Sequence, residues 1–202
     1  MALAHKGLPW EAIPWRFCDK GQNTNPTQVP VLIDGGERLI DSWNIAVHLE
    51  DRFPDRPSLF GSRSAIAITR FVNSWADSIL IPAIARVILL DIYQCISAAD
   101  RDYFRTSREA YFGTSLEQVV ADQPQRLADL RTALQPLRRM LKNQRFIGGS
   151  TPTYADYCVF GMFMWTRCAS RVSIIEPEDT VAPWYEGLLD AFGGLARNAP
   201  SI

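Results

Sequence analysis

Residues 28–49, QVPVLIDGGERLIDSWNIAVHL, combine a short hairpin pattern with the start of a helix. Two apolar runs flank Gly35 and Gly36, and a Gly-Gly pair is typical of a tight β-turn between antiparallel strands. Asp41 and Ser42 follow the second run, after which apolar residues recur at helical spacing. We expect Ser42 to be the N-cap. The segment therefore predicts an α/β unit that brings an acid and a hydroxyl to the mouth of a helix.

A connector rich in proline and serine separates this unit from the rest of the chain. Residues 54–64, PDRPSLFGSRS, contain two prolines, one glycine and three serines, a composition typical of a linker. Before the connector, residues 10–17 (WEAIPWRF) read as an aromatic edge strand that tolerates one proline, and ALAHKG reads as the end of a helix stopped by Gly7. The expected layout is an N-terminal domain over 1–53 and a second domain over 65–202.

The second part of the chain shows helical periodicity nearly throughout, with apolar residues at three- and four-residue steps. A kink is expected near Pro82, because proline lacks the N–H that a helix interior needs. The second part is therefore predicted to be all helical. The expected helical stretches are residues 71–92, 100–113, 124–143, 151–168 (a buried helix) and 182–196.

Composition excludes several function classes. The formal net charge is -1, from 21 basic and 22 acidic residues, so no nucleic-acid partner is expected. The four cysteines form no CxxC pair, and the two histidines leave too few ligands at metal spacing. No metal is expected, and Cys18 and Cys95 are expected to be small, buried apolar side chains.

The chain shows neither a membrane segment nor a signal peptide pattern. Its most apolar run, residues 79–90, is interrupted by Pro82 and Arg86 and is too short to span a bilayer. The N-terminus lacks the apolar core and cleavage site of a secretory signal. The sequence therefore predicts a cytoplasmic protein with free thiols and no membrane partner.

Four segments carry a likeness to a known family. They are ALAHKGLPWEAIPW (2–15), VPVLIDGGERLIDSWNIAVHLEDRFPDRPSLF (29–60), DRDYFRTSREAYFG (100–113) and FIGGSTPTYADY (146–157). Along nearly its whole length the chain resembles glutathione transferases, and within that superfamily it is most similar to the glutathione-dependent β-etherases. The resemblance implies the glutathione transferase fold, a thioredoxin-like α/β N-terminal domain followed by an all-α C-terminal domain.

The resemblance also implies a glutathione site at Gln28, Val29, Pro30, Asp41 and Ser42. In the family the proline of the Val-Pro pair is cis, and Val29 would hydrogen-bond the cysteinyl part of glutathione as an added strand does. Ser42 and the helix N-terminus would hold the γ-glutamyl carboxylate, while Asp41 would accept from the ammonium group. Gln28 would contact the ligand through its side chain. Taken alone, these residues also fit a plain strand start and an ordinary N-cap.

A second motif is predicted to stabilise the fold. Thr153 and Asp156 have the spacing of the N-cap and N3 positions of a capping box, and the resemblance implies that Asp156 is structural. Four aromatic side chains could wall an acceptor pocket, but residues at helical spacing are more often core. These aromatic residues are Phe71, Trp75, Tyr103 and Tyr111.

The catalytic group is not assigned. In the family a Ser, Tyr or Cys at the turn between the first strand and first helix lowers the pKa of the glutathione thiol, and the thiolate attacks an electrophile. Met1 already aligns inside that helix, so the first strand, the turn and most of the helix are expected to be missing. An internal start of a longer protein, a truncated chain and a naturally shortened relative all remain open.

Two functions follow from the resemblance. One is a glutathione-dependent transferase that acts on a hydrophobic electrophile, with aryl-ether cleavage as the subgroup hint, working as a homodimer. The other is a non-catalytic binding or interaction protein that keeps the fold and has lost the chemistry.

Overall fold

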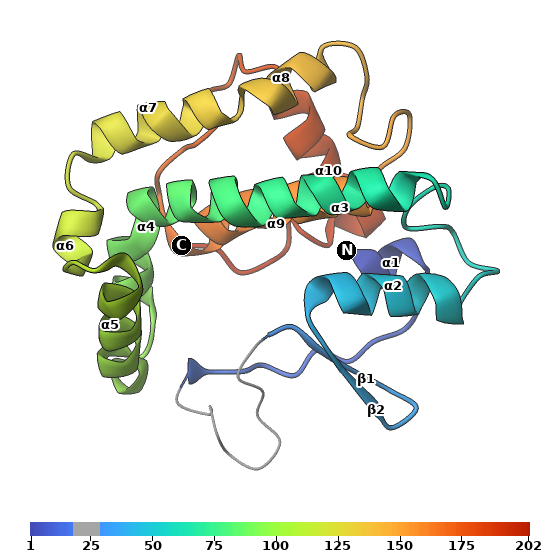
Figure 1. Ribbon diagram of the computed structural model, residues 1–202, viewed down its shortest axis with the longest axis horizontal. Coiled ribbons are helices and arrows are strands. Elements are labelled where there is room, and N and C mark those ends of the chain that lie inside the picture. The colour runs from blue at the N-terminus through green and yellow to red at the C-terminus, as the bar shows by residue number, and fades with distance from the viewer. Residues whose placement is uncertain (18–28) are drawn as a thin grey trace.

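The N-terminal part of the protein is a small α/β unit built around one hairpin. The computed structural model describes residues 1–17 and 29–202. The hairpin strands pair antiparallel, and the turn residues Gly35 and Gly36 have φ values of 57° and 89°, the positive range that a tight hairpin turn needs. The predicted hairpin is therefore confirmed. The elements are α1 (Ala2–His5), β1 (Val31–Asp34), β2 (Glu37–Ile40) and α2 (Ser42–Arg52) (Figure 1).

The strand expected at residues 10–17 is wrong. Residues 10–16 have no regular secondary structure, and within the described residues the sheet has only the two strands of the hairpin. The aromatic residues that suggested a strand serve packing instead. Phe17 lies 5.6 Å from Trp15 and 5.9 Å from Phe104 between ring centroids. Phe104 belongs to α5 (Ala98–Phe112), so this segment is held by side chains rather than by strand pairing.

The second part of the chain is helical, as predicted. A continuous helix runs through residues 65–95 and contains one π-helical turn, η2. Pro82 lies in the first turn of the segment after η2, so the irregularity expected at this proline takes the form of a π-helical turn just before it. The elements are α3 (Ala65–Trp75), η2 (Ala76–Leu80), α4 (Ile81–Cys95), α5, α6 (Leu116–Val119), α7 (Gln123–Ala133), α8 (Gln135–Leu141), α9 (Tyr154–Ala169) and α10 (Ala182–Gly194).

The single helix expected over residues 124–143 is two helices. α7 ends at Ala133 and α8 begins at Gln135, with Leu134 between them. Pro136 lies in the first turn of α8, where its missing N–H costs nothing. The leucines face the core as their periodicity predicts, since Leu130, Leu134 and Leu137 are buried, but the helix restarts before Pro136.

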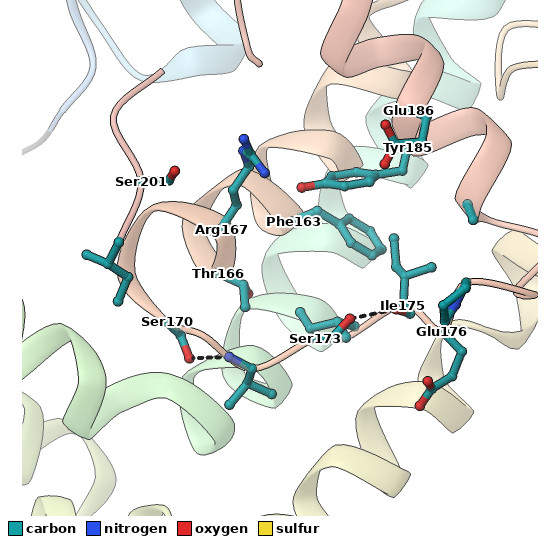
Figure 2. Close-up of a pocket in the computed structure, with 15 residues that line it drawn as sticks. Phe163, Thr166, Arg167, Ser170, Ser173, Ile175, Glu176, Tyr185, Glu186 and Ser201 are labelled. Carbon is teal, nitrogen blue, oxygen red and sulfur yellow. Dashed lines mark hydrogen bonds between the residues drawn. The ribbon is translucent and has the colours of Figure 1, made fainter. Parts of the chain in front are cut away.

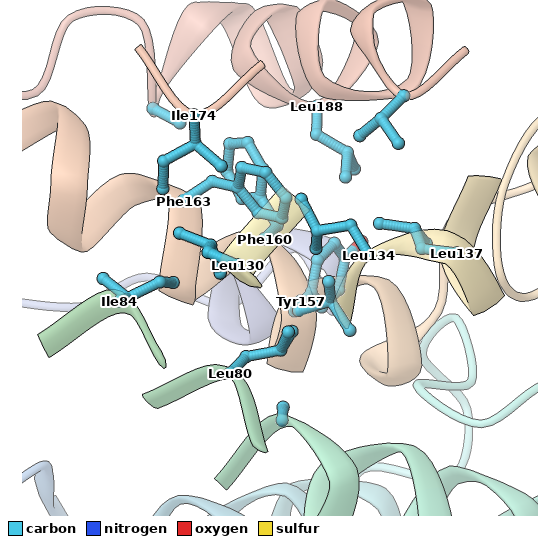
Figure 3. Packing of buried hydrophobic residues seen from close by; sticks show 14 of the residues in the cluster. Leu80, Ile84, Leu130, Leu134, Leu137, Tyr157, Phe160, Phe163, Ile174 and Leu188 are labelled. Carbon is cyan, nitrogen blue, oxygen red and sulfur yellow. The ribbon is translucent and has the colours of Figure 1, made fainter. Parts of the chain in front are cut away.

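The core forms around α9, the helix predicted to be buried. α9 runs beside α3 and α4 (Figure 1), and its side chains Phe160 and Phe163 are 1% and 3% exposed. Figure 3 shows these rings between Ile84 of α4, Leu130 of α7 and Leu188 of α10. Four segments distant in sequence thus share one core.

The long helix does not bury all the residues that its pattern suggests. Phe71 is 73% exposed, whereas Thr69 and Asn73 on the other side of α3 are 4% and 7% exposed. The two most buried side chains of α3 are therefore polar, although Ile66, Val72 and Trp75 also pack against the core. After the π-helical turn the pattern is normal, and Ile84 and Ile88 are buried.

By length and composition the helix over residues 65–95 is apolar enough to cross a membrane. An 18-residue window of it has a mean hydropathy of 1.6, and 39% of that window is buried inside the protein. The helix is longer than the apolar run 79–90 because helical structure continues on both sides of it. Its buried side chains Leu80 and Ile88 belong to the core, as in a core helix of a globular domain.

Candidate functional site

The predicted site begins at the Val-Pro pair. The Val29–Pro30 peptide bond is cis, and the pair directly precedes β1. Both residues are exposed, Val29 by 54%. Gln28, the remaining predicted residue of this segment, lies outside the described residues.

Asp41, and not Ser42, caps α2. The Asp41 Oδ1 atom accepts a hydrogen bond from the Asn44 N–H at 3.0 Å, and Ser42 is the first residue of the helix. Asp41 has φ 74° and ψ 125°, a conformation that costs a non-glycine residue about 1–3 kcal/mol. The predicted N-cap, Ser42, is therefore wrong by one residue. Serine and aspartate both cap helices well, and only the backbone conformation decides between them.

Tyr154 of α9 holds the start of α2 in place. Its hydroxyl donates to the Ser42 carbonyl oxygen at 2.7 Å, and its ring packs edge-on against Trp43 with centroids 6.1 Å apart. Burial raises the pKa of Tyr154 above its ordinary value, so the hydroxyl keeps its proton and stays a donor at neutral pH. The sequence does not indicate this role of Tyr154, because nothing in the motif around it points to a partner 112 positions away.

Ser42 opens onto a cavity of about 560 Å³ between the two parts of the chain. One side of the cavity is polar: the Asn73 amide donates to Asp77 at 2.5 Å, and the Cys158 thiol donates to the Asn73 side-chain oxygen at 3.4 Å. The other walls are largely apolar, so the cavity can take a molecule with one polar and one apolar end. The apolar wall includes Phe160, Met162, Met164, Leu195 and Ala196.

Two titratable groups in this cavity have shifted pKa values. Burial raises the pKa of Asp77, and the neighbouring Asp41 carboxylate raises it further. Burial, followed by the charge of Asp77, raises the pKa of the Cys158 thiol to about 12. Cys158 is therefore a neutral thiol at pH 7 and no nucleophile.

Several residues proposed from the sequence do not belong to this cavity. Phe71 and Tyr111 are 73% and 75% exposed, so they neither wall it nor pack in the core. Tyr103 contacts Phe17, with ring centroids 5.8 Å apart. Cys95 is exposed and not buried as expected, and Cys18 lies outside the described residues.

Asp156 is a buried structural acceptor, and the predicted capping box is present. The side chain is fully buried and accepts from the backbone N–H groups of Thr153, Ile147 and Gly148 at 2.8, 2.7 and 3.1 Å. It also accepts from the Trp184 indole at 2.9 Å. Asp156 thus ties the start of α9 to the preceding loop and to α10.

A buried polar network joins the N-terminal part to the helical part. The Lys6 ammonium is 1% exposed and pairs with Glu50 at 2.7 Å, and Glu50 accepts from the Ser58 hydroxyl. His5 contacts the Ser58 carbonyl oxygen at 3.0 Å and the Tyr157 hydroxyl at 2.7 Å. Because a carbonyl only accepts, the neutral His5 carries its proton on Nε2 and accepts at Nδ1.

The comparisons with known proteins agree with this architecture. Residues 1–57 match the family model described as "Glutathione S-transferase, N-terminal domain", and residues 67–192 match "Glutathione S-transferase, C-terminal domain". The second match alone covers more than half of the chain.

Solved structures with similar folds include fungal, bacterial and plant glutathione transferases. A glutathione transferase from Phanerochaete chrysosporium has a TM-score of 0.80 at 21% identity, covering 100% of this chain and 88% of its own. One from Ceriporiopsis subvermispora, in complex with glutathione, has a TM-score of 0.73 at 20% identity, covering 97% and 84%. One from Rhodospirillum rubrum has a TM-score of 0.73 at 23% identity, covering 100% and 86%.

The two family matches occur in the order in which the structure arranges its parts. A small α/β unit with a hairpin is followed by an all-helical domain, and this is the fold that the sequence predicted. The chain belongs to the glutathione transferase family and has its fold.

Proposed function

We propose that this protein binds glutathione and directs its thiolate onto a hydrophobic electrophile. The observation that carries the proposal is the opening of Ser42, at the N-terminus of an 11-residue helix, onto a cavity that is polar at one side and apolar elsewhere. The first N–H groups of a helix have no acceptor within the helix and attract a carboxylate. Ser42 and these groups would bind the γ-glutamyl carboxylate, and Asp41 would accept from its ammonium group.

The other proposed contacts to glutathione come from the residues that precede β1. Val29 precedes β1 and would pair through its backbone with the cysteinyl part of glutathione, with Pro30 fixing its direction. Gln28 would add a side-chain contact. The sulfur would then face the cavity, where the protein holds it and excludes water. Glutathione itself supplies the nucleophile, and the residue that lowers its thiol pKa is not assigned.

The apolar wall favours a hydrophobic acceptor. Met162 and Met164 are unbranched and polarisable, and such side chains adapt to acceptors of different shape. Phe160 adds an aromatic surface beside them. We propose aryl ethers as the acceptor class on the likeness to β-etherases.

Calorimetry and activity measurements test the two candidate functions together. We expect glutathione to bind the wild-type chain, Ser42→Ala to weaken binding, and the protein to conjugate a generic aryl halide or to cleave a β-aryl ether. Glutathione binding without turnover of either compound would favour the non-catalytic binding protein. Absence of binding would refute the glutathione site itself.

We also propose that the protein is a homodimer. Ile68 and Phe71 lie three residues apart on α3 and are 69% and 73% exposed, and exposed apolar patches of this kind mark contact surfaces. We further propose a cytoplasmic location. The proposed division is an N-terminal domain over residues 1–53, a linker over 54–64 and a helical domain over 65–202.

A further inference from the structure

A second cavity lies on the helical part of the protein. It has a volume of about 470 Å³, which is within the range of small-molecule pockets. It is formed by the second half of α9, residues 170–177, the N-terminal half of α10 and residues 201–202 (Figure 2). It shares no lining residue with the cavity at Ser42, so it is separate from the proposed glutathione site.

The apolar wall of this cavity suits a flat ring. Phe163 and Tyr185 have ring centroids 5.8 Å apart at an angle of 45°, and Figure 2 shows the Phe163 ring beside the Tyr185 ring. Ile174 and Ile175 line the same space. An aromatic ligand could stack or pack edge-on here, as aromatic side chains do with one another.

Two neighbouring polar groups in the cavity lack partners. Thr166 is 3% exposed, and its hydroxyl has no hydrogen-bond partner among the residues that the structure describes. The same holds for the Nε atom of Arg167. A buried donor without an acceptor is costly. Because the guanidinium group only donates, the missing partner must be an acceptor.

Arg167 supplies the positive charge that an anion would meet in this cavity. The acidic side chains of the lining each have a partner, Glu176 with Arg131 and Glu186 with Arg197, which also pairs with Asp190. Arg167 also lines the cavity and forms no ion pair with any described residue.

The Tyr185 hydroxyl adds a donor at the same point. Burial raises the pKa of Tyr185, although the nearby Arg167 acts in the opposite direction, so the hydroxyl stays protonated at neutral pH. In Figure 2 the hydroxyl end of Tyr185 is turned toward Arg167. An oxyanion next to Arg167 would therefore meet a guanidinium and a hydroxyl together.

We propose that this cavity is a second binding site, which takes an aromatic monocarboxylate. The carboxylate accepts hydrogen bonds from Arg167 and Thr166, and the ring lies against Phe163 and Tyr185. The site acts independently of glutathione.

Calorimetry with 2-naphthoate as the probe and 2-naphthamide as its neutral analogue tests the proposal. We expect naphthoate to bind more tightly than naphthamide, and the same affinity with or without saturating S-hexylglutathione. Arg167→Gln should raise the Kd for naphthoate more than tenfold and abolish the preference over naphthamide, since a charge-assisted hydrogen bond is lost. Thr166→Val should raise the Kd about fivefold without lowering the melting temperature, because the hydroxyl has no partner to lose.

A matched variant separates a local contact from a general effect of charge. Arg139→Gln removes the same charge from an exposed position of α8 that lines no part of the cavity, and should leave the Kd unchanged. The proposal is overturned if naphthoate does not bind, if naphthamide binds equally well, or if S-hexylglutathione displaces naphthoate. Equal loss of affinity in the Arg139 and Arg167 variants also overturns it.

Discussion

Asp41 caps a helix and also belongs to the proposed glutathione site. Its side chain caps α2 through Oδ1, its backbone adopts φ 74°, and its charge acts on Asp77 in the cavity. The cap needs only an acceptor oxygen, whereas recognition of an ammonium group needs the negative charge. A substitution that removes the charge and keeps the oxygen therefore separates the two roles.

Asp41→Asn should leave the melting temperature nearly unchanged and raise the Kd for glutathione about tenfold, the loss expected for a charge-assisted hydrogen bond. Isothermal titration calorimetry and thermal melting measure the two effects. Asp55→Asn, at an exposed position in the connector, is the control for the change in net charge. A large drop in melting temperature with unchanged affinity would contradict the proposed role.

Asp156, in contrast, serves only the fold, because all its hydrogen-bond partners lie inside the protein. Asp156→Ala leaves three backbone N–H groups and the Trp184 indole without their acceptor. We expect the free energy of unfolding in urea to fall by about 3–5 kcal/mol, at roughly 1 kcal/mol or more for each buried donor.

The folded fraction of the Asp156 variant should bind glutathione with unchanged affinity, because Asp156 does not line the cavity at Ser42. Asp102→Ala removes an exposed carboxylate from α5 and should leave the stability unchanged. A folded Asp156→Ala protein with the wild-type melting temperature would show that the capping box is dispensable.

At the scale of elements, an ion pair fastens α8 to the segment before α10. The Arg138 guanidinium donates from Nε and Nη2 to the Asp179 carboxylate at 2.7–3.0 Å. The two side chains are only 16% and 6% exposed. Asp179 also accepts from the Val181 N–H at 3.0 Å, so the pair positions the start of α10 as well.

Arg138→Met should lower the free energy of unfolding by about 3 kcal/mol, because removing one partner leaves a mostly buried charge uncompensated. Arg138→Lys should recover part of the loss, since an ammonium group cannot form the bidentate contact. Urea denaturation measures both changes. Equal stability of the Met and wild-type proteins would show that the pair contributes nothing to the docking of α10.

At the scale of the whole molecule, His5 couples the joining of the two parts to pH. Burial lowers the pKa of His5, and the hydrogen bond to the Ser58 carbonyl opposes that change. The unfolded chain then takes up the proton at a higher pH than the folded protein does. The contribution of His5 to stability should therefore be constant above the ordinary histidine pKa of about 6.5 and fall as the pH drops below it.

His5→Gln keeps one donor and one acceptor but does not titrate, so it should remove this loss between pH 7 and pH 5. The difference between the wild-type and variant unfolding curves isolates the contribution of His5. His48→Gln is the matched control, since these are the two histidines of the chain, and it should retain the loss. Parallel curves for wild type and His5→Gln would refute the coupling.

The exposed apolar surface that Ile68 and Phe71 form on α3 concerns the assembly of the whole molecule. If it is the surface between two copies, Phe71→Lys should convert a dimer to a monomer in analytical ultracentrifugation while the melting curve stays cooperative, because Phe71 is 73% exposed and supports no core contact. Tyr111→Lys, which changes an equally exposed aromatic residue on α5, should leave the dimer intact. An unchanged mass for the Phe71 variant would exclude this face.

The sequence by itself determined those features whose hydrogen bonds and contacts close within a few residues. The Gly-Gly hairpin and the Thr153–Asp156 capping box are of this kind, since the turn and the cap are complete within four neighbouring positions. The helical character of the second part is also local, because it follows from periodicity. The family resemblance placed these pieces in order along the chain.

Only the tertiary structure decided which faces are buried and which side chains meet. It placed Thr69 and Asn73 inward and Phe71 outward on α3, and it joined the Tyr154 hydroxyl to Ser42 across the two parts of the chain. Burial and long-range contacts depend on how separate elements pack, and a period of 3.6 residues marks a face without saying what covers it. For that reason the sequence indicated the helix mouth at Asp41 and Ser42, whereas the cavity in front of it required the packed molecule.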